Sequence, residues 1–246
     1  MKKLVYLILF FGACTTGIAQ FAGQASSNMS AGGGQGAQGQ IYDLMGPISE
    51  RNAKNEDRYA EFQGSPYISN TYLPTTMYYG DENLGTIFYR YNALNEEIEI
   101  KKTNSEEETA KSLSRDKEVS ILSNGKKLSF KTFVTSKNKT LNGYLTTLMD
   151  GKNYKLFKRT HVKFTEGKPA ANSFVKAVPS RFSQFTEYYY QKEGVNRMDE
   201  ISLKNSKLVK LVDDSKKDEL KSYLKENDLN IKDEADLIRA FEFLNQ

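Results

Sequence analysis

The residues of this chain that could do chemistry are few and widely spaced. His161 is the single histidine, so the sequence offers no histidine pair for a metal ion and no second histidine base. Glu97 and Glu99 lie two residues apart in an alternating segment, so both side chains are expected on one face of a strand. In glycoside hydrolases the two catalytic carboxylates instead flank a cleft. We therefore expect an exposed histidine on a polar strand face and a solvated glutamate pair.

Other polar patterns also stop short of a binding motif. Asp228 and Asn230 begin a segment that looks like a calcium loop. An EF-hand needs Gly at its sixth position and Glu at its twelfth, where this chain has Asp233 and Arg239. Helix capping explains these acids better. No nucleophile elbow, phosphate-binding loop or dinucleotide fingerprint is present. The sequence therefore predicts no catalytic residue, no metal and no cofactor.

Aromatic residues are the best candidates for binding. The chain has 15 Tyr and 14 Phe but no Trp. Two runs of consecutive tyrosines lie in expected strands, and in a run of three at least one side chain must face outward. An exposed tyrosine offers apolar area with one polar group, which suits a protein or glycan partner, whereas half-buried strand tyrosines are the commoner arrangement. The expected partner surface consists of Tyr78, Tyr79, Arg90, Tyr188, Tyr189 and Tyr190.

The first nineteen residues predict export. Lys2 and Lys3 precede an apolar run from Leu4 to Ala13, and small residues follow up to Ala19. This is the order of a secretory signal peptide, and its apolar run is too short to span a bilayer. We therefore expect a periplasmic, outer-membrane-associated or secreted protein.

Two processing routes are open. Cleavage after Ala19, with Gly17 as the second small residue, would release a soluble protein. Alternatively, Gly12-Ala13-Cys14 fits a lipobox, although Phe11 stands where Leu, Val or Ile is usual. Cys14 would then carry a lipid anchor, which is the only membrane contact that the sequence predicts. An uncleaved anchor is the third option.

Charge and cysteine content limit the partners further. Loss of Lys2 and Lys3 with the signal peptide lowers the formal net charge from +4 to +2. A nucleic-acid partner would need a concentrated basic surface, so none is expected. Cys14 is the only cysteine, so the chain cannot form an internal disulfide.

Composition divides the chain into four segments. Residues 1–19 are the expected signal peptide. Residues 20–63 are rich in Gly, Ser and Gln and predict a flexible leader and linker. Residues 64–202 predict a β domain, and residues 203–246 predict a helical tail packed on that domain.

The expected fold is a β-rich α+β protein. Short alternating runs are separated by turn residues such as Asn124-Gly125 and Asp150-Gly151, which are typical of hairpins. They predict an antiparallel meander of about eight strands. After Leu203 the apolar period becomes helical, which predicts two or three helices that cover the sheet.

Short motifs in the β domain are similar to those of a known group. Gly64-Ser65-Pro66-Tyr67 is followed by Leu73-Pro74, by Arg90-Tyr91-Asn92 and by Glu97-Ile98-Glu99. In these motifs the chain resembles a family of secreted Bacteroidota proteins of uncharacterised function. The resemblance runs from Gly64 to the C-terminus. It implies an envelope location and a β domain with a helical tail, and it brings no activity and no site residues.

These features predict an exported cell-envelope protein. Its expected role is non-enzymatic, as a binding or structural module for another protein or a surface polymer such as a glycan. The alternative is a carbohydrate-active hydrolase whose two carboxylates come from different strands and meet only after folding. A cleft with two inward carboxyl groups would favour the hydrolase.

Overall fold

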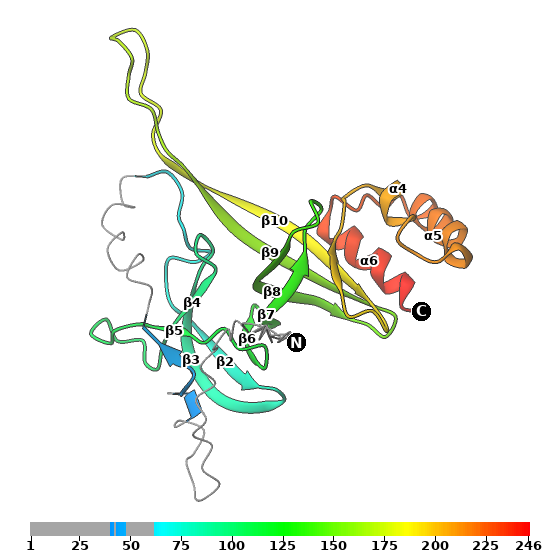
Figure 1. The fold of residues 1–246 in the computed structure, drawn as a ribbon, viewed down its shortest axis with the longest axis horizontal. Helices are drawn as coiled ribbons and strands as arrows, with labels where there is room; N and C mark the ends of the chain where they lie inside the picture. Colours follow the sequence, from blue (N-terminus) through cyan, green and yellow to red (C-terminus); the bar gives the residue numbers. More distant parts are fainter. Residues whose placement is uncertain (1–39, 42, 48–61) are drawn as a thin grey trace, which may run out of the picture. The chain divides into compact units, whose positions relative to one another are not determined.

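The computed structural model describes residues 40–41, 43–47 and 62–246, which belong to one of the chain's two units, Gln35–Gln246. The expected signal peptide, the Cys14 lipobox and most of the leader lie outside these residues. Within them, eleven strands form one sheet and three helices follow at the C-terminus (Figure 1). The predicted β-rich α+β class is confirmed, but the expected count of about eight strands is wrong.

Six strands make the first part of the sheet. In spatial order they are β1 (Met45–Gly46), β5 (Lys111–Leu113), β4 (Glu97–Lys101), β3 (Glu82–Asn92), β2 (Leu73–Tyr79) and β6 (Val119–Ser123). β1 and β5 pair with each other and are too short to show alternation in the sequence, which explains why they were not expected. β1 lies in the expected linker, and nearby Ile41 is buried in the first hydrophobic core. The folded part therefore extends to residues before Gly64.

Five strands close a ring in the second part. They are β7 (Lys126–Val134), β8 (Thr140–Asp150), β9 (Tyr154–Thr165), β10 (Arg181–Lys192) and β11 (Met198–Glu200). Successive strands pair antiparallel, and β11 returns to β7 through one parallel pair, Asp199 with Val134. Each strand contributes one side chain to the core inside this ring, namely Phe133, Leu145, Phe157, Tyr189 and Met198. The expected antiparallel meander therefore closes on itself by one parallel contact.

The C-terminal helices pack on the sheet, as the sequence predicts. They are α4 (Asn205–Leu208), α5 (Asp214–Glu226) and α6 (Glu234–Leu244). Apolar residues of all three share a hydrophobic core with Leu156 and Tyr188 of the β9–β10 hairpin. Asp233 begins α6, where its carboxylate accepts hydrogen bonds from the backbone of Ala235 and Asp236. No helix of the described residues is long and apolar enough to cross a membrane.

The β9–β10 hairpin extends beyond the strands that close the ring. Its pairing runs from Tyr154 with Lys192 to Thr165 with Arg181, whereas β8 accompanies β9 only as far as Lys158. Beyond that point the two strands continue as a ribbon, yellow-green in Figure 1. We call residues 160–186 the hairpin arm.

The backbone around Gly64 packs directly against this arm. Gln63 donates its backbone N–H to Ser180 and accepts one from Phe182, at 3.0 and 2.8 Å. Gly64 has a φ of +81°, and a Cβ at this position would lie 2.7 Å from the Phe182 carbonyl oxygen. Glycine is therefore required both by the backbone conformation and by the close contact.

We expect Gly64→Ala to destabilise the protein more than Gly194→Ala. Gly194 has a similar φ of +72° but no atom within 4 Å of a built Cβ. Both variants lose about 1–2 kcal/mol from the left-handed backbone, and only Gly64→Ala must also displace the Phe182 carbonyl. Urea unfolding of the two variants measures the difference. Equal losses would contradict the close contact.

Candidate functional site

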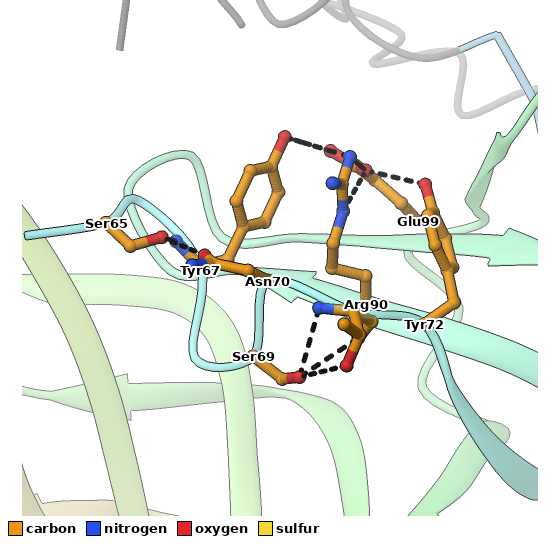
Figure 2. Close-up of polar contacts among 8 residues, drawn as sticks. Ser65, Tyr67, Ser69, Asn70, Tyr72, Arg90 and Glu99 are labelled. Atoms are coloured by element: carbon orange, nitrogen blue, oxygen red, sulfur yellow. Dashed lines mark hydrogen bonds and ion pairs between the residues drawn. The ribbon is translucent and has the colours of Figure 1, made fainter. Parts of the chain in front are cut away.

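Arg90 forms a buried ion pair. Its Nε and Nη2 donate to Glu99 Oε2 at 3.0 and 2.6 Å. Its guanidinium carbon lies 3.9 Å from the ring centroid of Tyr67 and 4.8 Å from that of Tyr72. Both tyrosine hydroxyls donate to Glu99, at 3.2 and 3.0 Å, and Figure 2 shows the two rings on either side of the guanidinium. Arg90 is therefore committed to the interior and is unsuited to a free partner surface.

The prediction that Glu97 and Glu99 lie on a solvated face of β4 is wrong. Glu99 is 1% exposed and Glu97 is 8% exposed. The alternation of Ile98 with these glutamates is real, but both faces of the strand are covered. The segment around Tyr67 and Tyr72 lies over the glutamate face and supplies hydrogen-bond donors to it.

The motifs that carry the family resemblance contact one another. Ser65 Oγ accepts the backbone N–H of Tyr67 at 3.1 Å and lies 2.5 Å from the Asn70 side chain (Figure 2). The Pro66 carbonyl accepts the backbone N–H of Ala93 at 2.8 Å, at the end of the Arg90-Tyr91-Asn92 motif. The spacing of these motifs therefore serves packing.

We expect Glu99→Gln to destabilise the protein by about 3–5 kcal/mol, because it leaves the Arg90 charge without its counter-ion in a buried site. Glu107→Gln is the matched control, since Glu107 is exposed and should change stability by less than about 0.5 kcal/mol. Denaturant unfolding at neutral pH measures both. A loss at Glu99 no larger than the control's would contradict the buried ion pair.

The tyrosines of β10 do not form the expected exposed surface. Tyr188 is 8% exposed, Tyr189 is fully buried, and Tyr190 packs half-buried against the helices. β10 has the ring core on one face and the helical core on the other, so successive side chains are covered on both sides. In the other tyrosine run, Tyr78 is half-buried and Tyr79 is 43% exposed. Only Tyr79 is thus open to a partner.

Arg159 on β9 binds two glutamates from distant parts of the chain. It donates Nε to Glu96 Oε1 at 2.8 Å, with Nη2 bound to the same oxygen, and Nη1 to Glu187 Oε2 at 2.7 Å. Glu96 lies in the turn between β3 and β4 with a φ of +52°. Its carboxylate lies against Gly143 of β8, where a Cβ would overlap it. The left-handed turn and the missing side chain together bring Glu96 to Arg159.

The pKa values of the two carboxylates shift in opposite directions. Burial raises the pKa of Glu96 in spite of Arg159. Burial also opposes ionisation of Glu187, but hydrogen bonds from Arg159 and Tyr189 outweigh it and lower the pKa of Glu187. Glu187 is therefore the more firmly ionised partner of Arg159.

His161 lies beside this ion-pair set and is buried, so the expected exposed histidine is wrong. It is 7% exposed, and its ring stacks on Phe185 with centroids 5.5 Å apart. Its Nε2 is 3.9 Å from Glu187, and its buried Nδ1 has no hydrogen-bond partner within the described residues. The β3–β4 turn docks here through a 2.9 Å bond from the Val162 N–H to the Ala93 carbonyl. A turn distant in sequence therefore contacts a strand segment that looked polar.

We expect acid to destabilise the protein through His161. Burial lowers the pKa of His161 from its usual 6.5, although Glu187 opposes the shift. The unfolded chain therefore takes up a proton near pH 6.5 that the folded chain resists, and stability falls as the pH drops from above 6.5 toward the folded pKa. Because this histidine is the only one, its ring NMR signals report the folded pKa directly.

His161→Gln supplies the control for this titration. The variant should show a shallower loss of stability between pH 7 and pH 5.5 than the parent. A folded midpoint at or above 6.5 would show instead that the Glu187 carboxylate outweighs burial.

A small polar pocket opens beside Arg159. It has a volume of about 320 Å³ and lies next to the β3–β4 turn; we call it the junction pocket. Arg115 donates only a long 3.4 Å bond to the Asn95 carbonyl there. Glu96 is the single carboxylate among the described residues that line it.

A larger groove of about 390 Å³ crosses the sheet; we call it the sheet groove. Its walls come from β2, β3, β6, β7, β8, β9, β10 and α6, and from the loops before β2 and after β6. Buried or half-buried tyrosine rings of β3 and β8 line it, with hydroxyl and amide side chains between them. These residues include Tyr89, Tyr91, Tyr144, Ser69, Ser123, Asn124, Thr146, Thr160 and Gln184.

Charges in the sheet groove are mostly neutralised. Lys158 forms a 2.7 Å ion pair with Glu234, which also accepts the Tyr188 hydroxyl at 2.8 Å. Arg90 borders the groove but is paired with Glu99. Lys126 also lines the groove and is in no ion pair of the described part of the chain. The groove thus offers neutral hydrogen-bonding groups and one cation, Lys126, that acts on Glu234 through its charge without forming an ion pair within the described residues.

Neither metal chemistry nor known relatives point to an activity. In the part of the chain that the structure describes, no group of three or more His, Cys, Asp or Glu could hold a metal ion. Comparisons with protein-family models, with curated proteins and with solved structures find no match. Functional inference therefore rests on the geometry of the cavities and the surface.

Proposed function

We propose that the chain is an exported cell-envelope protein that binds a surface glycan without catalysis, and that the sheet groove is its ligand site. The observation that carries this proposal is the lining of the groove, where hydroxyl and amide side chains lie among apolar ones. Its volume of about 390 Å³ falls in the range of ordinary ligand pockets. Export rests on the sequence of residues 1–19.

The chemistry of the lining suits a polyhydroxylated ligand. Gln184 and Asn124 each offer a donor and an acceptor, and the Thr146 and Thr160 hydroxyls can do either. Ile68 and Leu73, which are 45% and 37% exposed, give an apolar edge against which a sugar ring can rest. Lys126, which forms no ion pair within the described residues, favours a glycan that carries carboxylate or phosphate groups.

The placement of the carboxylates supports binding over hydrolysis. Glycoside hydrolases need two carboxyl groups about 5 to 9.5 Å apart across the scissile bond. Glu234 is the single carboxylate among the described residues lining the sheet groove, and it is paired with Lys158. Glu96 and Glu187 do meet from different elements, but each is bound to Arg159. The Arg159 guanidinium thus forms ion pairs with both members of this carboxylate pair, which leaves neither free to act as a hydrolase acid or nucleophile.

Lys126→Gln should weaken binding of an acidic polysaccharide about fivefold, which corresponds to about 1 kcal/mol. Lys127→Gln is the matched control, because its side chain points to the opposite face of β7 and is exposed. Isothermal titration calorimetry with polygalacturonate and with acidic polysaccharide extracted from the envelope measures both variants, with neutral dextran as a further ligand.

Equal affinities of the Lys126 and Lys127 variants would contradict the groove as the binding site. Release of reducing ends from either polysaccharide would overturn the non-enzymatic role and favour the hydrolase.

A further inference from the structure

The tip of the hairpin arm exposes large apolar side chains. Phe174 is 95% exposed, and Val175 and Val178 are 51% and 56% exposed. None of the three belongs to a hydrophobic core of the described residues. Exposure of a large apolar side chain to water is unfavourable in free energy. A group of such side chains at one place is typical of an interaction site.

The tip is folded and held on a stiff base. Lys168 and Val178 exchange two backbone hydrogen bonds of 2.8 Å, which continue the hairpin past the ends of β9 and β10. Asn172 accepts the backbone N–H of Phe174 at its side chain, at 3.0 Å. Near the base, the rings of Phe62, Phe164 and Phe182 pack with centroids 5.3 to 5.9 Å apart. The apolar tip is therefore presented at the end of an ordered support.

Cations lie in the same arm as these apolar residues, two of them within the tip. Lys163, Lys168, Lys176 and Arg181 are exposed and take part in no ion pair within the described residues. Glu166 is the single acid in the sequence of the hairpin arm. The arm is thus strongly basic although the whole chain is nearly balanced in charge.

We propose that the tip of the hairpin arm, residues 166–180, binds the surface of an anionic lipid bilayer. Phe174, Val175 and Val178 enter the boundary between headgroups and acyl chains, and the lysines contact the acidic headgroups. A small apolar tip with cations close by in the sequence complements a surface that is uniformly negative and apolar beneath. Long basic side chains can bury their stems while their charges stay at the interface.

This contact is separate from the sheet groove and from the expected anchor at Cys14. It gives the protein a reversible membrane contact that needs no acyl chain. The strength of such a contact depends on both the apolar area and the headgroup charge, so each component can be removed by itself.

Vesicle co-sedimentation tests the proposal with the exported full chain, in a Cys14→Ser background so that no acyl chain contributes. Vesicles of phosphatidylglycerol mixed with phosphatidylcholine should bind the protein at least about tenfold better than pure phosphatidylcholine at low salt. Phe174→Ser with Val175→Ser should lower the partition coefficient about tenfold. Lys168→Gln with Lys176→Gln should remove the preference for phosphatidylglycerol.

Val195→Ser is the matched control, because Val195 is 45% exposed but lies between β10 and β11, outside the arm. It should bind as the parent does, and so should the groove variant Lys126→Gln. Equal binding by the parent and the Phe174 and Val175 variant would overturn the proposal. A second result would also overturn it. If the parent does not bind vesicles but captures a protein partner that the Phe174 and Val175 variant loses, the tip binds a protein and not a membrane.

Phe174→Trp gives a second measurement that keeps the native surface. The chain has no tryptophan, so fluorescence reports the tip alone. The emission should shift to the blue with phosphatidylglycerol vesicles, and lipids brominated on the acyl chains should quench it. A spectrum unchanged by these vesicles would overturn the insertion of the tip.

Discussion

The charge set of Arg159, Glu96 and Glu187 joins the two parts of the sheet. Glu96 belongs to the β3–β4 turn, whereas Arg159 and Glu187 belong to the ring. Buried charges lose so much hydration that such a set adds little net stability, but a partner that is absent or misplaced is costly. The set therefore specifies position: it holds the turn against β9, next to the backbone bond from Val162 to Ala93. The sheet groove depends on this docking, because its walls come from β3 on one side and from β8 and β9 on the other.

The sequence pattern predicted turns and helices well, because residues close in sequence determine them. The Asn124-Gly125 turn does connect two strands, and the helical period after Leu203 does end in packed helices. Alternation showed that Glu99 and Tyr189 lie on particular strand faces, but it could not show what covers each face. β4 and β10 are covered on both sides, and the covering segments are distant in sequence. For this reason a glutamate pair and a tyrosine run that looked exposed are buried.

The candidate site could not be predicted from sequence for a related reason. Thr146, Thr160 and Gln184 are ordinary strand residues, and only the closure of the ring and the docking of β3 bring them around one groove. The family-like motifs carried a signal of another kind. Tyr67, Arg90 and Glu99 belong to a single packed cluster around the start of the β domain, so their spacing reflects a folding requirement. Pro169 and Pro179 in the basic and apolar tip are typical of a loop, but the exposure of that loop depends on how far the hairpin extends.

Closure of the ring also determines the order in which the protein can fold. The pairings from β7 to β11 along the chain are between successive strands, which can form as local hairpins in about 1–10 μs. The parallel pair of Val134 with Asp199 instead joins strands from opposite ends of the ring, and its loop-closure entropy must be overcome before it stabilises anything. Until β11 arrives, Val134 of β7 and Tyr189–Gln191 of β10 have unpaired backbone groups that can pair with another chain. The shortest strand of the ring therefore controls how long a newly made molecule stays prone to aggregation.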